Sequence, residues 1–154
     1  MTLTTHATIG AVIGRATGNP LLAFFIGFIS HFIFDIIPHG DSKLAKDYYV
    51  LKKKKKKAFA FVTIDGVIAL FLVLILANIK DIVDIRLYTW GVVGAVLPDL
   101  LVGLNDITKT KFLKKFHKLH FYFHNLATNK IGDVSFKFSL TCQIILIVIL
   151  QSFI

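Results

Sequence analysis

The sequence lacks most of what stabilises a small soluble or secreted domain. It contains no glutamate, and its single cysteine, Cys142, excludes a disulfide within the chain. Its first residues carry no basic cluster ahead of an apolar run, so we expect no cleaved signal peptide. Only 18% of the residues are charged, whereas 55% are hydrophobic. This hydrophobic fraction is larger than the core of a soluble domain of 154 residues needs, so the composition favours a membrane protein.

Long apolar runs occupy most of the chain. Several extend for roughly 18 to 22 residues, the length at which a helix crosses ~30 Å of hydrocarbon. We therefore predict an all-α fold, a polytopic membrane helical bundle with four or five spans and one cytoplasmic amphipathic helix. Residues 1–154 form a single integral membrane domain in this interpretation. The expected spans cover residues 5–18, 21–38, 58–79, 85–104 and 134–154, and the amphipathic helix covers residues 109–127. The first span contains Arg15 and is short, so we expect it to be tilted or half-inserted.

The basic residues lie in two of the connections between these spans. Residues 41–57, with the run from Lys52 to Lys57, and residues 105–133 are rich in lysine, whereas residues 80–86 also carry Asp81 and Asp84. Positively charged loops stay on the cytoplasmic side. We therefore predict a multi-pass protein of the cell membrane with its lysine-rich loops in the cytoplasm. Membrane lipids with anionic headgroups are the expected partners.

Nucleic acid is not an expected partner, although the formal net charge is +9. In a nucleic-acid-binding surface, lysines alternate with exposed aromatic residues. Here the lysines flank apolar spans and do not alternate in this way. The sequence leaves the oligomeric state open.

All six histidines fall where the spans meet the predicted cytoplasmic face. His31 and Asp35 are four residues apart and share one helix face, which His39 continues if the last turn holds. A carboxylate inside a span is costly unless it is paired or coordinated. Imidazole and carboxylate together suit a divalent metal, zinc foremost, with manganese and iron as alternatives. The competing interpretation is a His–Asp hydrogen bond that only joins helices.

The predicted surface helix carries three further candidate metal ligands, His117, His120 and His124, which lie on one line between an apolar stripe and a lysine face. The alternative is an interfacial anchor that has histidines at its polar boundary. His6 is another candidate ligand. Glycines at four-residue intervals follow it and predict a close helix contact that turns His6 inward.

Two aspartates inside spans are candidate catalytic residues. Asp65 is not among the expected metal ligands, so its carboxylate can act as a general base. Alternatively, it can pair with Arg15 or cap a neighbouring helix. Asp99 is a candidate metal ligand as well. It follows Pro98, so its alternative role is to satisfy backbone groups that a kink sets free.

In this order the motifs resemble the membrane-bound metal-dependent hydrolase family, the YdjM-like proteins. The matching pieces are Thr5-His6 with Ile9-Gly10, Ser30-His31 with Asp35 and Pro38-His39, and residues 94–99, which end in Pro98-Asp99. The helix with His31 and Asp35 is also similar to one in zinc-dependent phospholipases C. The resemblance implies a metal-dependent hydrolase at the membrane face, with His6, His31, Asp35 and Asp99 as ligands. The expected substrate is a phosphate ester, for example one linked to a lipid.

The chain departs from the family pattern in two places. Leu100, Leu101 and Val102 follow Asp99 where family members often carry a further Asp and a His, and residues 116–120 replace a His-Arg…Thr-His element. The sequence therefore does not predict a complete second metal site. Two other classes of function stay open: a non-enzymatic membrane protein that binds or transports metal ions or protons, and a basic membrane scaffold. The outer halves of the spans, such as residues 68–77, are almost wholly apolar, which argues against transport.

Overall fold

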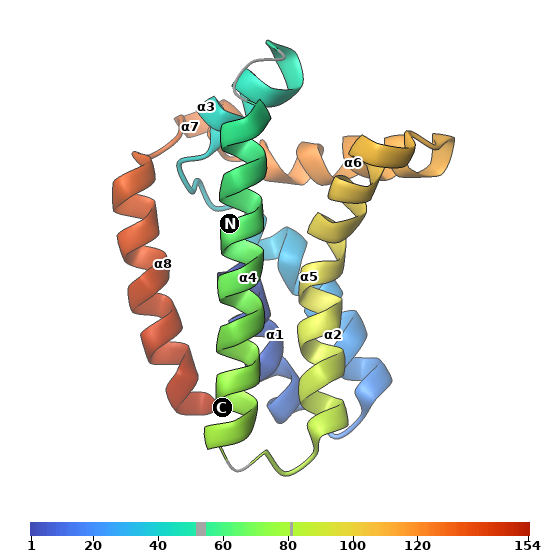
Figure 1. Cartoon of the computed structure of the whole chain (residues 1–154), viewed down its shortest axis with the longest axis vertical. Helices are drawn as coiled ribbons and strands as arrows, with labels where there is room; N and C mark the ends of the chain where they lie inside the picture. The colour runs from blue at the N-terminus through green and yellow to red at the C-terminus, as the bar shows by residue number, and fades with distance from the viewer. Residues whose placement is uncertain (52–54, 81) are drawn as a thin grey trace.

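The computed structural model describes residues 1–51, 55–80 and 82–154. Part of the lysine run, Lys52 to Lys54, and Asp81 lie outside the described residues. The described residues form helices joined by turns and contain no β-strand, so the predicted all-helical bundle is confirmed (Figure 1).

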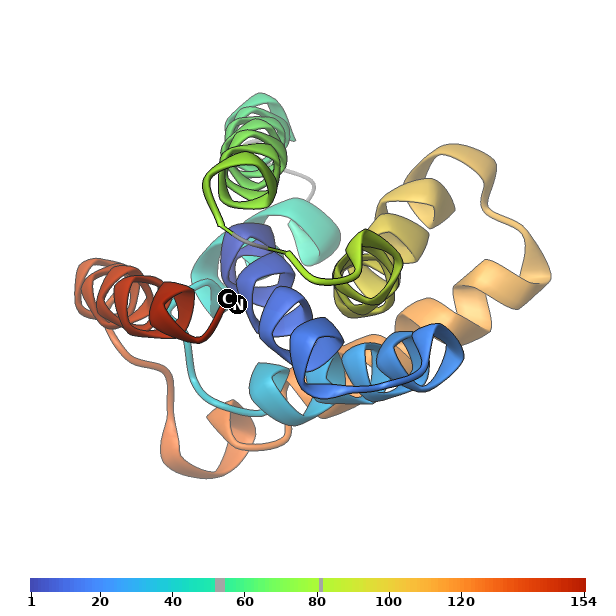
Figure 2. The ribbon, with the colours of Figure 1, turned by 90° about the horizontal axis from the view of Figure 1, so that it is seen from below.

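The helices form a bundle that is closed at one end by a helix lying across it. In chain order they are α1 (Leu3–Ala16), α2 (Pro20–Asp35), α3 (Ser42–Ala45), η1 (Lys46–Val50), α4 (Lys55–Ile79), α5 (Ile85–Thr108), α6 (Lys111–His124), α7 (Thr128–Ile131), α8 (Phe136–Leu150) and η2 (Gln151–Phe153). Both α1 and α2 pack on α5, while α4 and α8 pack on α1 (Figure 2). The α6 helix runs across the end at which α5 finishes (Figure 1).

Three helices are long and apolar enough to cross a membrane: Lys56–Ile79, Ile85–Thr108 and Phe136–Phe153. The α2 helix is apolar but has only 16 residues, which is about 24 Å at 1.5 Å per residue. It ends at Asp35 and not at residue 38, because Pro38 disfavours a helical conformation in the residue before it. The α1 helix is shorter still, with 14 residues.

The outer faces of α4 and α8 are exposed although their side chains are apolar. Phe71 on α4 is 60% exposed and Phe138 on α8 is 62% exposed. Large continuous apolar surfaces of this kind are unusual on a soluble monomer. They suit helices that face hydrocarbon.

Glycines let α1 and α2 lie directly on the backbone of α5. A Cβ added at Gly91 would lie 2.8 Å from the backbone nitrogen of Gly14, and one at Gly27 would lie 2.6 Å from the Gly91 carbonyl oxygen. Small residues allow such close approach between membrane helices. The predicted glycine faces therefore form the central contact of the bundle.

The α5 helix continues through Pro98, where the sequence predicted an interruption of the span. Proline lacks the N–H that would pair with the carbonyl one turn earlier. Packing against neighbouring helices makes this tolerable in membrane helices, and Pro98 is fully buried. The helix ends at Thr108, and the next residue, Lys109, has a left-handed φ of 53°. The side chain of Thr110 then caps the first turn of α6.

Replacing Gly91 by Val should destabilise the fold, since the new side chain would collide with the α1 backbone. Overpacking typically costs ~1–3 kcal/mol, and this backbone contact should reach the upper end of that range. Thermal unfolding in detergent measures the loss. Gly103→Val, on the same helix, is the control because a Cβ there meets nothing within 4 Å. Equal losses in both variants would contradict the proposed role of the contact.

Candidate metal centre

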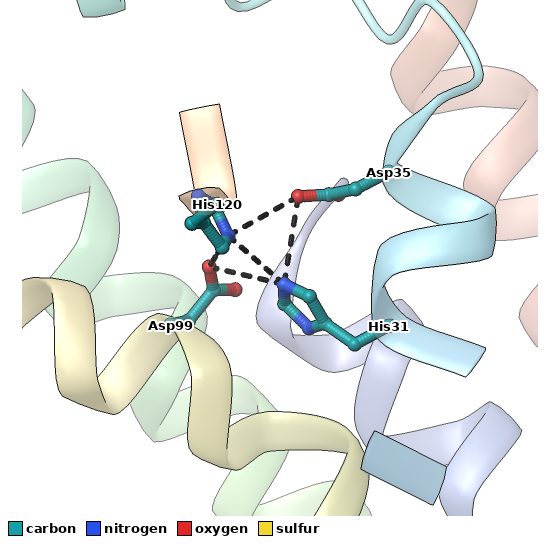
Figure 3. A group of neighbouring side chains, drawn as sticks. All are labelled: His31, Asp35, Asp99 and His120. Carbon is teal, nitrogen blue, oxygen red and sulfur yellow. Dashed lines mark hydrogen bonds and ion pairs between the residues drawn. The ribbon is translucent and has the colours of Figure 1, made fainter. Parts of the chain in front are cut away.

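Four side chains from three helices meet beneath α6. His31 and Asp35 come from α2, Asp99 from α5 and His120 from α6 (Figure 3). His31 Nε2 lies 3.0 Å from His120 Nε2 and 3.5 Å from Asp35 Oδ2. Asp99 Oδ1 lies 3.6 Å from His31 Nε2 and 3.3 Å from His120 Nε2. One ligand atom from each residue lies within 4.8 Å of the others, so these four residues, the first group, can hold a metal ion.

A second group of potential ligands follows the end of α2. His39 Nε2 lies 3.0 Å from His124 Nε2 and 3.2 Å from Asp41 Oδ1, and His124 Nε2 lies 3.3 Å from the same oxygen. His39, Asp41 and His124, the second group, can also hold a metal ion. The side chain of Asp41 is 29% exposed and that of Asp99 in the first group is 30% exposed. Each group therefore has one carboxylate that solvent or another molecule can reach.

Backbone and amide oxygens fix which nitrogen of these imidazoles faces inward. His31 Nδ1 lies 2.9 Å from the carbonyl oxygen of Ala95, and His39 Nδ1 lies 2.7 Å from that of Ile37. His124 Nδ1 lies 3.2 Å from the side-chain oxygen of Asn125. An oxygen of this kind can only accept, so each Nδ1 carries the proton and donates it. In the neutral ring the unprotonated Nε2 then points into its group.

This arrangement is the one in which proteins hold metal-binding histidines. A ligating imidazole almost always donates its other N–H to a carbonyl or carboxylate, which fixes the tautomer and the ring orientation. In both groups histidine Nε2 atoms converge with carboxylate oxygens; in the first group His120 Nε2 takes part although its Nδ1 has no hydrogen-bond partner among the described residues. A cation satisfies all of them at once. The described side chains therefore fit a divalent metal.

The electrostatics of the second group agree with this. Burial raises the pKa of the Asp41 carboxyl, but the neighbouring imidazoles of His124 and His39 outweigh that effect and hold the pKa well below its usual range. Burial lowers the pKa of His124, yet the contact with Asp41 and the charge of that carboxylate raise it above its ordinary value. Asp41 is therefore a carboxylate, the form in which it can bind a cation.

The loop that carries Asp41 is tied to the loop before α8. The Asp133 carboxylate accepts from the backbone nitrogens of Gly40, at 2.8 Å, and Ser42, at 3.0 Å. Gly40 has a φ of 81°, which favours glycine. The turn at Gly40 and the contact with Asp133 together hold Asp41 next to His39.

The two groups are neighbours. The other oxygen of Asp35, Oδ1, lies 3.1 Å from His6 Nε2. The amino group of Met1 contacts the same oxygen and lies 2.9 Å from His39 Nε2. The ring centroids of His120 and His124 are 6.1 Å apart. Asp35 therefore faces the first group with one oxygen and the side nearer the second group with the other.

Three predicted site residues fall outside both groups, as far as the described residues define them. His6 stacks on the His31 ring at 4.0 Å and contacts Asp35, so it supports a ligand in place of joining the group. His117 packs against Tyr49, with ring centroids 4.9 Å apart. Asp65 accepts from Leu3 N at 2.5 Å and from Thr4 Oγ1 at 2.6 Å. Asp65 thus occupies the position expected of a cap for a neighbouring helix.

Asp41 is the potential ligand that the sequence analysis missed. It lies in a lysine-rich segment, whose charges were interpreted only as a signal that orients the spans in the membrane. The available signal was its spacing, two residues after His39 and directly after a Pro-His-Gly turn. With Asp41 included, the chain carries a second group despite its departures from the family pattern.

Comparison of the chain with protein-family models, curated proteins and solved structures found no match. The functional inference therefore depends on the two groups and their surroundings.

Replacing His120 by Ala should remove the metal of the first group, because His120 lies at its centre. His117→Ala, three residues earlier on α6, should leave the metal content unchanged and serves as the control. Elemental analysis of detergent-purified protein gives the metal-to-protein ratio, and we expect a loss of one metal ion per chain only for His120→Ala. If the His120→Ala variant loses no metal, the first group is not a metal site, and its histidines and aspartates only form hydrogen bonds that join the helices.

Proposed function

We propose that the protein is a membrane-embedded, metal-dependent hydrolase of a phosphate ester, as membership of the YdjM-like family would also imply. The observation that carries the proposal is the convergence of histidine Nε2 atoms and carboxylate oxygens in two groups, in which Nδ1 of His31, His39 and His124 contacts an oxygen, beside a partly exposed carboxylate. Zinc is the proposed metal, and manganese and iron fit the same ligand types.

The roles of the side chains follow from their burial. His31, Asp35 and His120 are buried and would hold the cation, while Asp99 both contacts the group and can reach a substrate. A bound divalent cation supplies two things, a lowered pKa for a water molecule and polarisation of a phosphoryl oxygen. His6 positions Asp35 by its hydrogen bond to Oδ1. The side chain of Asp65 is hydrogen-bonded to the start of α1. We therefore propose Asp99, and not Asp65, as the group that accepts a proton near the metal.

A cavity lies beside the second group. Its volume is about 680 Å³, and two lysines, Lys43 and Lys57, and two aspartates, Asp47 and Asp133, are among the residues that line it. Because both signs of charge are present, the proposal of a phosphate ester depends on the metal ligands and not on this cavity.

The membrane arrangement is also part of the proposal. We propose four or five spans, with α2 and the short α1 completing the bundle that the three long helices begin. The lysine-rich segments and α6 lie at the same end as the two groups (Figure 1). With the lysines on the cytoplasmic side, the site faces the cytoplasm at the membrane surface.

Transport of ions or protons is less well supported. A transport path needs polar groups through the whole depth of the bundle. The end opposite α6 is packed with the buried apolar residues Ala11, Leu76, Tyr88 and Ile154. A basic scaffold, in turn, requires neither group of ligands.

Asp99→Asn should abolish turnover and leave the protein folded. Asparagine keeps the size of the side chain beside Pro98 but removes the charge that holds a cation and takes up a proton. Loss of one well-placed electrostatic contribution typically costs ~10²–10³ in rate. Hydrolysis of short-chain and lipid phosphate esters, with chelator and metal add-back, measures the effect. Asp84→Asn, at the far end of α5, is the control, because asparagine can still cap the helix there. Turnover that survives both the chelator and Asp99→Asn would refute the metal-hydrolase proposal.

Cysteine labelling tests the orientation. In a Cys142→Ser background, Lys130→Cys should resist a membrane-impermeant thiol reagent in intact cells, since the lysine-rich side is proposed to face the cytoplasm. Val83→Cys should react, because Val83 is 96% exposed in the connection at the opposite end. The reverse pattern would place the site on the outer face.

A further inference from the structure

An apolar groove runs between α2 and α6, next to the first group. Its volume is about 300 Å³, and it is lined by Phe28, Ile29, Phe32, Ile33, Ile36, Leu119 and Phe123. Ligand pockets usually have volumes of ~300–1,000 Å³. The groove is at the small end of that range and has room for one hydrocarbon chain.

Phe32 forms the wall between the groove and the first group. Its ring lies 5.6 Å from the His31 ring and 6.1 Å from the His120 ring, measured between centroids. Within the groove its ring lies 5.4 Å from that of Phe123. A molecule with its tail in the groove therefore has its head close to the metal ligands.

The groove opens sideways. Ile29 is 56% exposed and Ile33 is 58% exposed, although both line it. They lie on the apolar helix α2, so the open side continues the surface that faces hydrocarbon. A lipid chain can enter from the bilayer without crossing water.

The end of the groove at α6 carries positive charge. Lys115 precedes Leu119 by four residues, and Leu119 precedes Phe123 by four, so the three share one face of α6. Lys115 is exposed. An anionic head group beside this face complements both the lysine and a cation in the first group.

We infer that the groove holds the hydrocarbon chain of the substrate, which is then a long-chain amphiphile whose phosphate ester lies at the first group. This inference rests on the proposed function and narrows it to a lipid-like phosphate ester with one chain engaged. The apolar lining alone cannot select this substrate, because a chain is as well solvated in the bilayer as in a groove. Selection comes from the head group, and binding in the groove should therefore depend on the metal.

The test uses a long-chain alkyl phosphonate with a photoreactive diazirine in its chain, on metal-loaded protein in lipid nanodiscs. The carbon–phosphorus bond of the phosphonate resists hydrolysis, so binding is measured apart from turnover. The matched probe is the alcohol of the same chain, which lacks the anionic head. Mass spectrometry then locates the labelled residues.

We expect the phosphonate to label residues 28–36 and 119–123, and a chelator to reduce this labelling to the level of the alcohol. Ile33→Trp, which fills the groove, should give the same loss. Ile75→Trp on α4 is the matched control, because Ile75 is 52% exposed and lies outside the groove. Phosphonate labelling that matches the alcohol over α4 and α8, or labelling that the chelator leaves unchanged, would overturn the inference.

Turnover separates this inference from the proposed function. If a short soluble phosphate ester is hydrolysed while groove labelling fails, the hydrolase stands and the chain-binding groove is refuted. If groove labelling depends on the metal but neither short nor long esters are hydrolysed, the groove is supported and the hydrolase is refuted.

Discussion

The close contact of α2 with α5 is the constraint on which the first group depends. Gly27 lies against the backbone of α5 at Gly91, with no side chain between the two helices. This closeness allows His31 Nδ1 to reach the Ala95 carbonyl oxygen at 2.9 Å. That hydrogen bond fixes the tautomer and points Nε2 toward Asp35 and Asp99. A packing feature of apolar helices thus decides the chemistry of a polar site.

The arrangement places two carboxylates and two imidazoles in a bundle that is otherwise mostly apolar. Buried charged groups are costly unless they are paired or coordinated, and such groups in membrane proteins usually mark a functional site. The amino group of Met1 and His6 Nε2 both contact the Asp35 carboxylate. The inward nitrogens and the partly open Asp99 are left facing one another. Such a group of side chains could hold a metal ion.

The ends of the bundle have different characters. At one end α6 covers the two groups and the lysine-rich segments begin, while the other end is closed by the apolar cluster around Leu76 and Tyr88. The cavity near Asp41 and the apolar groove beside Phe32 both lie near the first of these ends. A substrate with a phosphate head and a hydrocarbon tail matches this division of polar and apolar surface.

The sequence by itself determined the helices and the face on which each candidate ligand lies. Apolar runs and the spacing of His31 and Asp35 are local properties, because the helical period decides which side chains share a face. Glycine spacing also predicted a close helix contact of α1, without identifying α5 as its partner.

Only the tertiary structure decided which faces meet. The left-handed turn at Lys109 and the turn at Gly40 direct α6 and Asp41 toward the end of α2, and neither direction follows from helical periodicity. The structure therefore separated His120 and His124, which join groups, from His117, which packs on Tyr49. It likewise identified Asp41 as a potential ligand. It also showed that His6 contacts the ligand Asp35 and that Asp65 binds the start of α1. The physical reason is that ligation needs several side chains within a few ångströms, and such distances are set by turns and helix packing between segments far apart in the chain.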